Sequence, residues 1–274
     1  MLAVAPASTS RPHPGRGRAL IPFALVAVLS LMVAPGVSAA PTCSYYVSGF
    51  RDDVTVQAGE IACGGDGDDV IGAIADGGTF LGGRGNDQVR FGVAEAGTFI
   101  GDDGNDFSEF LSGTFYGGAG NDGVIRGHGT FNGGPGDDTD IFVFGTFNGN
   151  DGNDSAHIVS GTFNGGRGRD VSDIVVGIFN GGDGSDTGIV VGGTFNGGDG
   201  DDIAPFVDAG TFNGGDGNDI VTSMNDPFAI GNPPVVNGGD GKDTVVTMTA
   251  GLFNGGDGKD VVVSFTGGTL ISVP

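Results

Sequence analysis

The sequence predicts an all-β protein: a parallel β-roll or β-solenoid of about twelve coils, each 16–18 residues long. Three observations carry this prediction. A glycine-rich hexapeptide recurs along the chain, an apolar residue stands two positions before almost every copy, and short β-branched runs follow many of them. Sixteen residues cannot hold a helix and two turns as well, so each coil is expected to contain two short strands.

The hexapeptide is Gly-Gly-x-Gly-x-Asp, and twelve copies begin between Gly64 and Gly255. The first and fourth positions are Gly and the sixth is Asp in every copy, whereas the second is Gly in ten. Such an array is typical of repeat proteins, in which each unit stacks only on its neighbours. The spacing widens to 24 residues after Gly214, and this predicts a loop insertion at about 224–234.

The segment before the repeats divides into two parts. Residues 1–39 carry three Arg, then an apolar run and a small-residue pattern ending at Ala39, as in a secretory signal peptide. An uncleaved membrane anchor is the alternative, although the apolar run is short for a membrane span. Residues 40–63 are expected to form an N-terminal cap, followed by the solenoid over 64–274. Because exported proteins meet an oxidising environment, Cys43 and Cys63 are predicted to form a disulfide rather than a metal or redox site.

The predicted core consists of one aromatic file and a facing file. Phe stands two residues before most hexapeptides, from Phe80 to Phe253, with Val236 as an exception. An apolar residue kept in every coil is expected to point inward and to stack on its copies. The facing strand is expected to contribute Phe91, Phe110, Phe142, Ile158, Ile174, Val190 and Phe206.

The composition narrows the function. The whole chain has a net charge of −23, and loss of three Arg with the signal peptide would leave 8 basic and 34 acidic residues, net −26. A nucleic-acid binder that uses a basic face is excluded on this ground. No Gly-x-Ser-x-Gly elbow is present, and His128 and His157 occupy different places in their coils, so the chain is not expected to be an enzyme.

The invariant Asp of each hexapeptide is the candidate metal ligand. Asp is a short carboxylate, and Gly permits the backbone to turn its carbonyl oxygens toward one point. Ca²⁺ takes six to eight oxygen ligands in flexible geometry. Two stacked turns would supply enough of them, so up to eleven Ca²⁺ ions are expected between the twelve turns. The candidate ligands are Asp69, Asp87, Asp106, Asp122, Asp138, Asp154, Asp170, Asp186, Asp202, Asp219, Asp243 and Asp260.

Turn capping and metals other than calcium account for this Asp less well. Asp also caps turns by bonding its own backbone, but Asn or Ser would serve equally well there. Zinc prefers Cys and His, and magnesium demands small octahedral sites. Calcium therefore explains the invariance best.

The hexapeptide resembles the RTX (repeats-in-toxin), or haemolysin-type, calcium-binding repeat, for example at Gly214–Thr222. The resemblance covers about residues 64–263 and implies a parallel β-roll with calcium held by the sixth-position Asp and backbone carbonyls. The chain departs from the family in having one motif per coil, which implies a single calcium column. Apolar residues are also missing after several motifs, for example at Asp140, Ser172 and Gly188.

The expected role is therefore a secreted, extracellular calcium-binding repeat protein with a structural or adhesive function. Its expected partners are calcium ions and a cell-surface or matrix component, with no nucleic acid and no membrane span after signal removal. One alternative is an ice- or crystal-binding surface, because Thr and Asn flank the Phe in five coils between Thr130 and Asn213 and would form two outward files, which Ile178, Val235 and Leu252 interrupt. A less favoured alternative is an accessory module of an enzyme.

Overall fold

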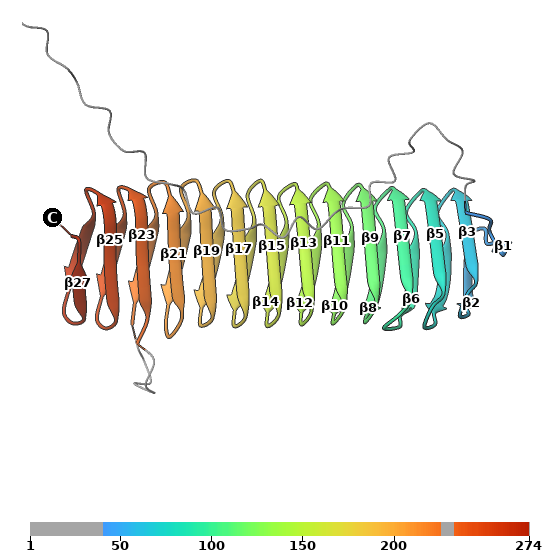
Figure 1. Cartoon of the computed structure of the whole chain (residues 1–274), viewed down its shortest axis with the longest axis horizontal. Helices are drawn as coiled ribbons and strands as arrows, with labels where there is room; N and C mark the ends of the chain where they lie inside the picture. The colour runs from blue at the N-terminus through green and yellow to red at the C-terminus, as the bar shows by residue number, and fades with distance from the viewer. Residues whose placement is uncertain (1–40, 226–232, 274) are drawn as a thin grey trace, which may run out of the picture. The chain divides into compact units, whose positions relative to one another are not determined.

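The computed structural model describes residues 41–225 and 233–273, which form an all-β parallel solenoid (Figure 1). The prediction of the fold class is confirmed. Described residues contain 27 strands and no helix. The odd-numbered strands are β1 (Tyr45–Tyr46), β3 (Ile61–Asp66), β5 (Thr79–Arg84), β7 (Thr98–Asp103), β9 (Thr114–Ala119), β11 (Thr130–Pro135), β13 (Thr146–Asp151), β15 (Thr162–Arg167), β17 (Ile178–Asp183), β19 (Thr194–Asp199), β21 (Thr211–Asp216), β23 (Val235–Gly241), β25 (Leu252–Gly258) and β27 (Thr269–Ile271). The even-numbered strands are β2 (Phe50–Val56), β4 (Val70–Ile74), β6 (Gln88–Val93), β8 (Phe107–Leu111), β10 (Gly123–Gly127), β12 (Thr139–Val143), β14 (Ser155–Val159), β16 (Val171–Val175), β18 (Thr187–Val191), β20 (Ile203–Val207), β22 (Ile220–Met224), β24 (Thr244–Met248) and β26 (Val261–Phe265).

Two parallel sheets run along the solenoid. The odd strands form a sheet of 14 strands and the even strands a sheet of 13, and each strand pairs with its equivalent one coil away. The register brings equivalent residues together, so that Phe147 pairs with Phe163 and Asn148 with Asn164. The hexapeptide turns consequently lie along one edge of the solenoid (Figure 1).

The aromatic file forms the centre of the core, as predicted. Its Phe side chains are completely buried, and Val236 is buried as well. From Phe80 to Phe195 consecutive rings stack with centroids 4.4–5.4 Å apart and planes within 14° of parallel. The ladder of like residues is therefore a direct result of the in-phase register.

The predicted facing file is wrong. Phe91, Phe110 and Phe206 are 63%, 43% and 46% exposed and lie on the outer face of the even sheet. Leu111 and Ser108 of β8 point inward instead, with Glu109 and Phe110 both outward between them. Since two consecutive residues face solvent, strict alternation fails and the inward positions are three residues apart. Phe142, Ile158, Ile174 and Val190 occupy the same outward position and are only partly buried.

The ends of the described chain bear on other predictions. Cys43 and Cys63 form the predicted disulfide, and β1 and β2 already belong to the two sheets. The predicted signal peptide, 1–39, lies outside the described residues, as do 226–232 of the predicted insertion. The insertion leaves the register intact, because Thr211 pairs with Val235 and Met224 with Met248 across it. In the described part, no helix has the length and apolar character to cross a membrane.

The outer face of the odd sheet carries the expected Thr and Asn files. Six side-chain hydrogen bonds of 2.7–2.8 Å join the Asn residues of successive coils from Asn132 to Asn237. In each bond the Nδ2 donates to Oδ1 of the preceding Asn, as from Asn164 to Asn148. We call these seven residues the Asn ladder: Asn132, Asn148, Asn164, Asn180, Asn196, Asn213 and Asn237.

Candidate metal centre in the aspartate column

The hexapeptide turns depend on left-handed backbone at their second position. Gly usually stands there, but the two exceptions, Asp102 and Asn150, have φ of 76° and 84°. Asn and Asp are the residues that tolerate this conformation best after Gly. The substitutions seen in the sequence are thus the ones that the turn permits.

All twelve predicted Asp side chains lie in one buried column, with relative exposure of 4% or less. Each of the eleven from Asp87 to Asp260 accepts, at Oδ1, a hydrogen bond from the backbone N–H of the equivalent Asp in the preceding coil. The lengths are 2.7–3.0 Å. Asp69 accepts the N–H of Gly49 in the same way, at 2.6 Å. We call this arrangement the aspartate column.

The second oxygen of each carboxylate is different. Oδ2 is buried without a hydrogen-bond partner in all twelve Asp. A buried polar atom without a partner is costly, and a charged one more so. This repeated deficit points to a positive partner that lies outside the protein's own donors.

The oxygen lies in a cradle formed by the first Gly of the hexapeptide. A Cβ placed on Gly165 would lie 2.1 Å from Asp170 Oδ2 and 2.7 Å from the carbonyl oxygen of Gly181 in the next coil. Equivalent contacts recur in the other coils, for example at Gly149 with Asp154 and Gly165. A carboxylate oxygen and a carbonyl oxygen of the next coil therefore meet beside eleven of the twelve first-position Gly.

This donor set fits calcium. It contains only oxygen, the ligand of hard cations, and it combines carboxylates with backbone carbonyls as calcium sites do. Groups of three or more acidic, His or Cys side chains that could hold a metal are absent from the described residues. The ligands would accordingly be one carboxylate per turn completed by carbonyl oxygens, and zinc would find neither thiolate nor imidazole.

Column carboxylates from Asp69 to Asp243 resist ionisation in the absence of metal, because burial raises the pKa of each. Burial raises the pKa of Asp106, Asp138 and Asp202 to about 8, with neighbouring column carboxylates adding to the effect and the backbone hydrogen bond opposing it. Burial also raises the pKa of Asp170 to about 7 and that of Asp186 to about 6. A cation that compensated the charge would remove this penalty.

Two features of the site were not predicted from the sequence. Asn or Asp at the fifth hexapeptide position forms an outer file in which Oδ1 accepts the backbone N–H of the next coil, as from Asn105 to Asn86 at 2.8 Å. The signal was present, since that position is Asn or Asp in eight of the twelve copies. The other is Asp140, fully buried in the core with both oxygens unpartnered and its pKa raised by burial to about 7.

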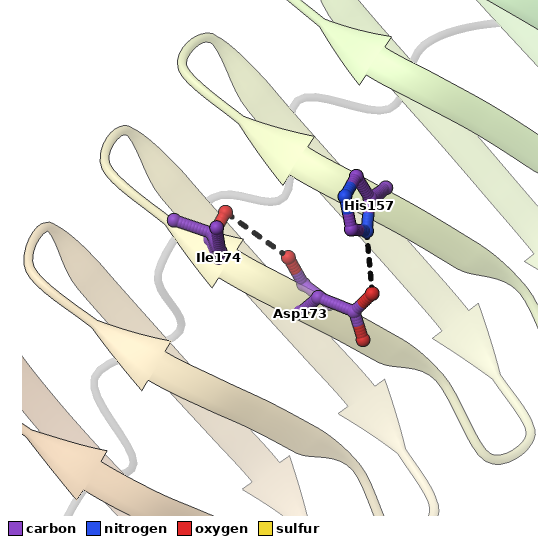
Figure 2. A network of polar contacts seen from close by, with 4 residues as sticks. His157, Asp173 and Ile174 are labelled. Atoms are coloured by element: carbon purple, nitrogen blue, oxygen red, sulfur yellow. Dashed lines mark hydrogen bonds and ion pairs between the residues drawn. The ribbon is translucent and has the colours of Figure 1, made fainter.

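The two described His residues lie apart from the column. His157 Nδ1 is 2.5 Å from Asp173 Oδ2 on the outer face of the even sheet, and both side chains are about half exposed (Figure 2). His128 stacks on Phe144 instead. The structure does not bring the two His together.

Comparisons with known proteins give one structural similarity. No family model matches the chain, and no curated protein matches it. Among solved structures, the chain is similar to a hyperactive, Ca²⁺-dependent, β-helical antifreeze protein from an Antarctic bacterium, at 21% identity and a TM-score of 0.42, over 86% of this chain and 83% of that one. Similarity at this level says nothing of what the present chain binds.

Proposed function

We propose that the protein is an exported calcium-binding solenoid, without enzymatic activity, whose folded state depends on Ca²⁺ ions in the aspartate column. The observation that carries the proposal is the buried, unpartnered Oδ2 repeated in twelve coils. In this proposal Asp Oδ2 and the carbonyl oxygens of the Gly-rich turns hold the ions. The bound metal supplies positive charge between stacked turns, and the role outside the cell is structural or adhesive.

The charge of the chain supports this proposal. Eleven Ca²⁺ ions would bring +22 to a mature chain of net −26. The column Asp would otherwise stand about 4.8 Å apart, where like charges repel strongly. The resemblance of the hexapeptide to the RTX repeat supports the same ion.

The direct test is titration of the chelator-treated protein with Ca²⁺, followed by calorimetry and circular dichroism. We expect several ions to bind per chain and strand signal to increase with them. Asp170→Asn should remove binding at the middle of the column. Asp183→Asn is the matched control, because Asp183 is an exposed residue of the neighbouring turn. A strand spectrum unchanged by chelator and no heat of binding would overturn the proposal.

A second candidate function is binding to ice or another crystalline surface through the Thr and Asn files. The Asn ladder favours it, because its amides are fixed to one another at the repeat of the sheet, which makes the file rigid and regular. Ile178 and Val235 interrupt the Thr file and speak against it. Thermal hysteresis and ice-recrystallisation assays of calcium-loaded protein decide the matter. Thr146→Lys should abolish an ice-binding activity that uses this face. Absence of activity in the parent protein would contradict this second candidate function.

A further inference from the structure

Every residue of the Asn ladder is followed by Gly. The same dipeptide occurs at the equivalent position of β25, which makes eight Asn–Gly pairs in successive coils. The structure explains why the two residues are joined. Asn supplies the ladder, and the following Gly is the first residue of the hexapeptide, where a side chain would collide with the column Asp. In each coil of the ladder, one peptide bond therefore joins a ladder Asn to the Gly that borders the aspartate column.

Among dipeptides that begin with Asn, Asn–Gly is also the one most prone to deamidation, the loss of the side-chain amide. The backbone nitrogen of Gly, after losing its proton to hydroxide, attacks Cγ of Asn, and the Cγ–Nδ2 bond breaks with release of ammonia. Water then opens the resulting cyclic imide at one of its two carbonyls and leaves Asp or isoaspartate. Gly favours the attack because it has no side chain to obstruct the nitrogen and permits a wide range of backbone angles.

The fold holds the reacting groups away from this geometry. Asn164, for example, donates through Nδ2 to Asn148 and accepts at Oδ1 from Asn180, each at 2.7 Å. Its backbone and that of Gly165 lie inside β15, and the two residues that flank Gly165, Asn164 and Gly166, pair with the strands on both sides. The side-chain amide cannot rotate toward the Gly nitrogen without breaking two hydrogen bonds and distorting the strand.

We propose that the Asn ladder is a row of latent deamidation sites that the folded solenoid protects, so that prolonged unfolding becomes irreversible. Deamidation would replace a ladder donor by a carboxylate. Isoaspartate would also lengthen the backbone by one methylene just before the Gly whose carbonyl lines the aspartate column. Either product would prevent the coil from restacking in register. This loss of refolding is separate from calcium binding, since it requires only that the fold be lost.

The chain contains two internal controls. Asn254 precedes Gly255 in β25 but, among the described residues, makes no ladder hydrogen bond, whereas Asn180 makes two. Asn of the outer file, such as Asn105 and Asn153, precedes Asp rather than Gly. The three classes share one chain and one buffer, and they differ in sequence or in hydrogen bonding.

The experiment is incubation of the full chain in mildly alkaline buffer, folded in one arm and unfolded by urea in the other, with peptide mapping by mass spectrometry over time. We expect ladder Asn to deamidate at least tenfold faster when unfolded and outer-file Asn to change much less. Recovery of strand signal after urea removal should fall in step with ladder deamidation. Within the folded arm, Asn254 should react before Asn180.

The variant Asn180→Thr separates the protection given by the ladder hydrogen bonds from the protection given by strand pairing. It removes the acceptor of Asn196 Nδ2 and should speed folded-state deamidation of Asn196 while leaving that of Asn132 unchanged. In the parent protein, equal deamidation rates at Asn180 in the folded and the unfolded arm would overturn the proposal. Full refolding of a deamidated chain would do so as well. Both arms contain calcium, so the folded arm stays folded whether or not the fold depends on the ion, and urea unfolds the chain in the other arm.

Discussion

The Asn ladder and the aspartate column satisfy the polar atoms of their side chains in opposite ways. Both repeat one polar side chain in successive coils, and in both each residue bonds to its equivalent in the next coil. An amide is donor and acceptor at once, so the ladder satisfies itself. A carboxylate only accepts, and Oδ2 of every column Asp remains without a partner. Neutral repeats can thus satisfy their own hydrogen bonds, whereas the charged aspartate column needs a partner from outside the chain.

Removal of calcium should have the largest effect on this comparison. At ten times Kd each independent site adds about 1.4 kcal/mol to stability, so eleven sites add about 15 kcal/mol. That is comparable to the whole stability of an ordinary domain. Chelator should therefore lower the melting temperature followed by circular dichroism by a wide margin, while magnesium at the same concentration should not restore it. A melting temperature that does not change with chelator would show that protons or water, rather than calcium, satisfy the Oδ2 atoms of the column.

The pH dependence of the metal-free chain should be the reverse of the usual one. The pKa of Asp138 is about 8 in the folded chain, against an ordinary value of 3.8. At low pH both states hold the proton, but as pH rises past 3.8 the unfolded state ionises first and is favoured. Stability should thus fall between about pH 4 and pH 8, at up to about 1.4 kcal/mol per group for each pH unit.

Calcium should invert that slope, because its binding requires ionised carboxylates. Urea unfolding at a series of pH values, with and without calcium, measures both slopes. A metal-free chain that is more stable at pH 8 than at pH 4 would contradict the buried, unpartnered state of the column.

One substitution in the column should change sign with metal. Asp170→Asn keeps an Oδ1 acceptor for the N–H of Asp154 but removes the charge. With calcium it should cost roughly 3 kcal/mol, from two adjoining sites at about 1.4 kcal/mol each. Without calcium it should stabilise by up to about 4 kcal/mol at neutral pH, because the pKa of Asp170 is raised to about 7 and its ionisation opposes folding.

Asn164→Asp is the matched change in the ladder. It loses the donor to Asn148 and sets two oxygen atoms against each other, so it should cost about 1–2 kcal/mol with or without calcium. Chemical denaturation of the two variants in both conditions gives the four values. The same sign for Asp170→Asn in both conditions would count against a metal-dependent column.

The sequence allowed the prediction of those features that repeat in phase. Asp170 and Phe163 recur in their coils at fixed places, and an in-register stack must align them, so the column and the aromatic file were predictable. Phe110 and Phe142 were misplaced because the even strands put two consecutive residues outside, which alternation cannot reveal. Hydrogen bonding within the Asn ladder also went unpredicted, since it depends on side-chain rotamers rather than on which face a residue occupies.

The cradle should be sensitive to a single methyl group. Gly165→Ala would place Cβ 2.1 Å from Asp170 Oδ2 and 2.7 Å from Gly181 O. Overpacking of this kind costs about 1–3 kcal/mol and should also weaken calcium binding. Gly192→Ala is the control, because its Cβ would have only Val175 O within 4 Å, at 3.7 Å, so it should change stability by less than about 0.5 kcal/mol. Equal melting temperatures for the two variants would show that the turn yields and that the cradle is not tightly built.

Replacement of a single ladder Asn tests whether the ladder stabilises the fold at all. Asn180→Thr suits the strand but breaks the bonds with Asn164 and Asn196, and each hydrogen bond contributes about 0.5–1.5 kcal/mol net. Asn254→Thr makes the same chemical change where the described residues show no ladder bond. We therefore expect a loss of about 1–2 kcal/mol for the first variant in urea denaturation and little change for the second. If the two variants lose the same stability, the ladder amides contribute no more than their contacts with water would. The stability of these coils would then come from the aromatic file and the aspartate column alone.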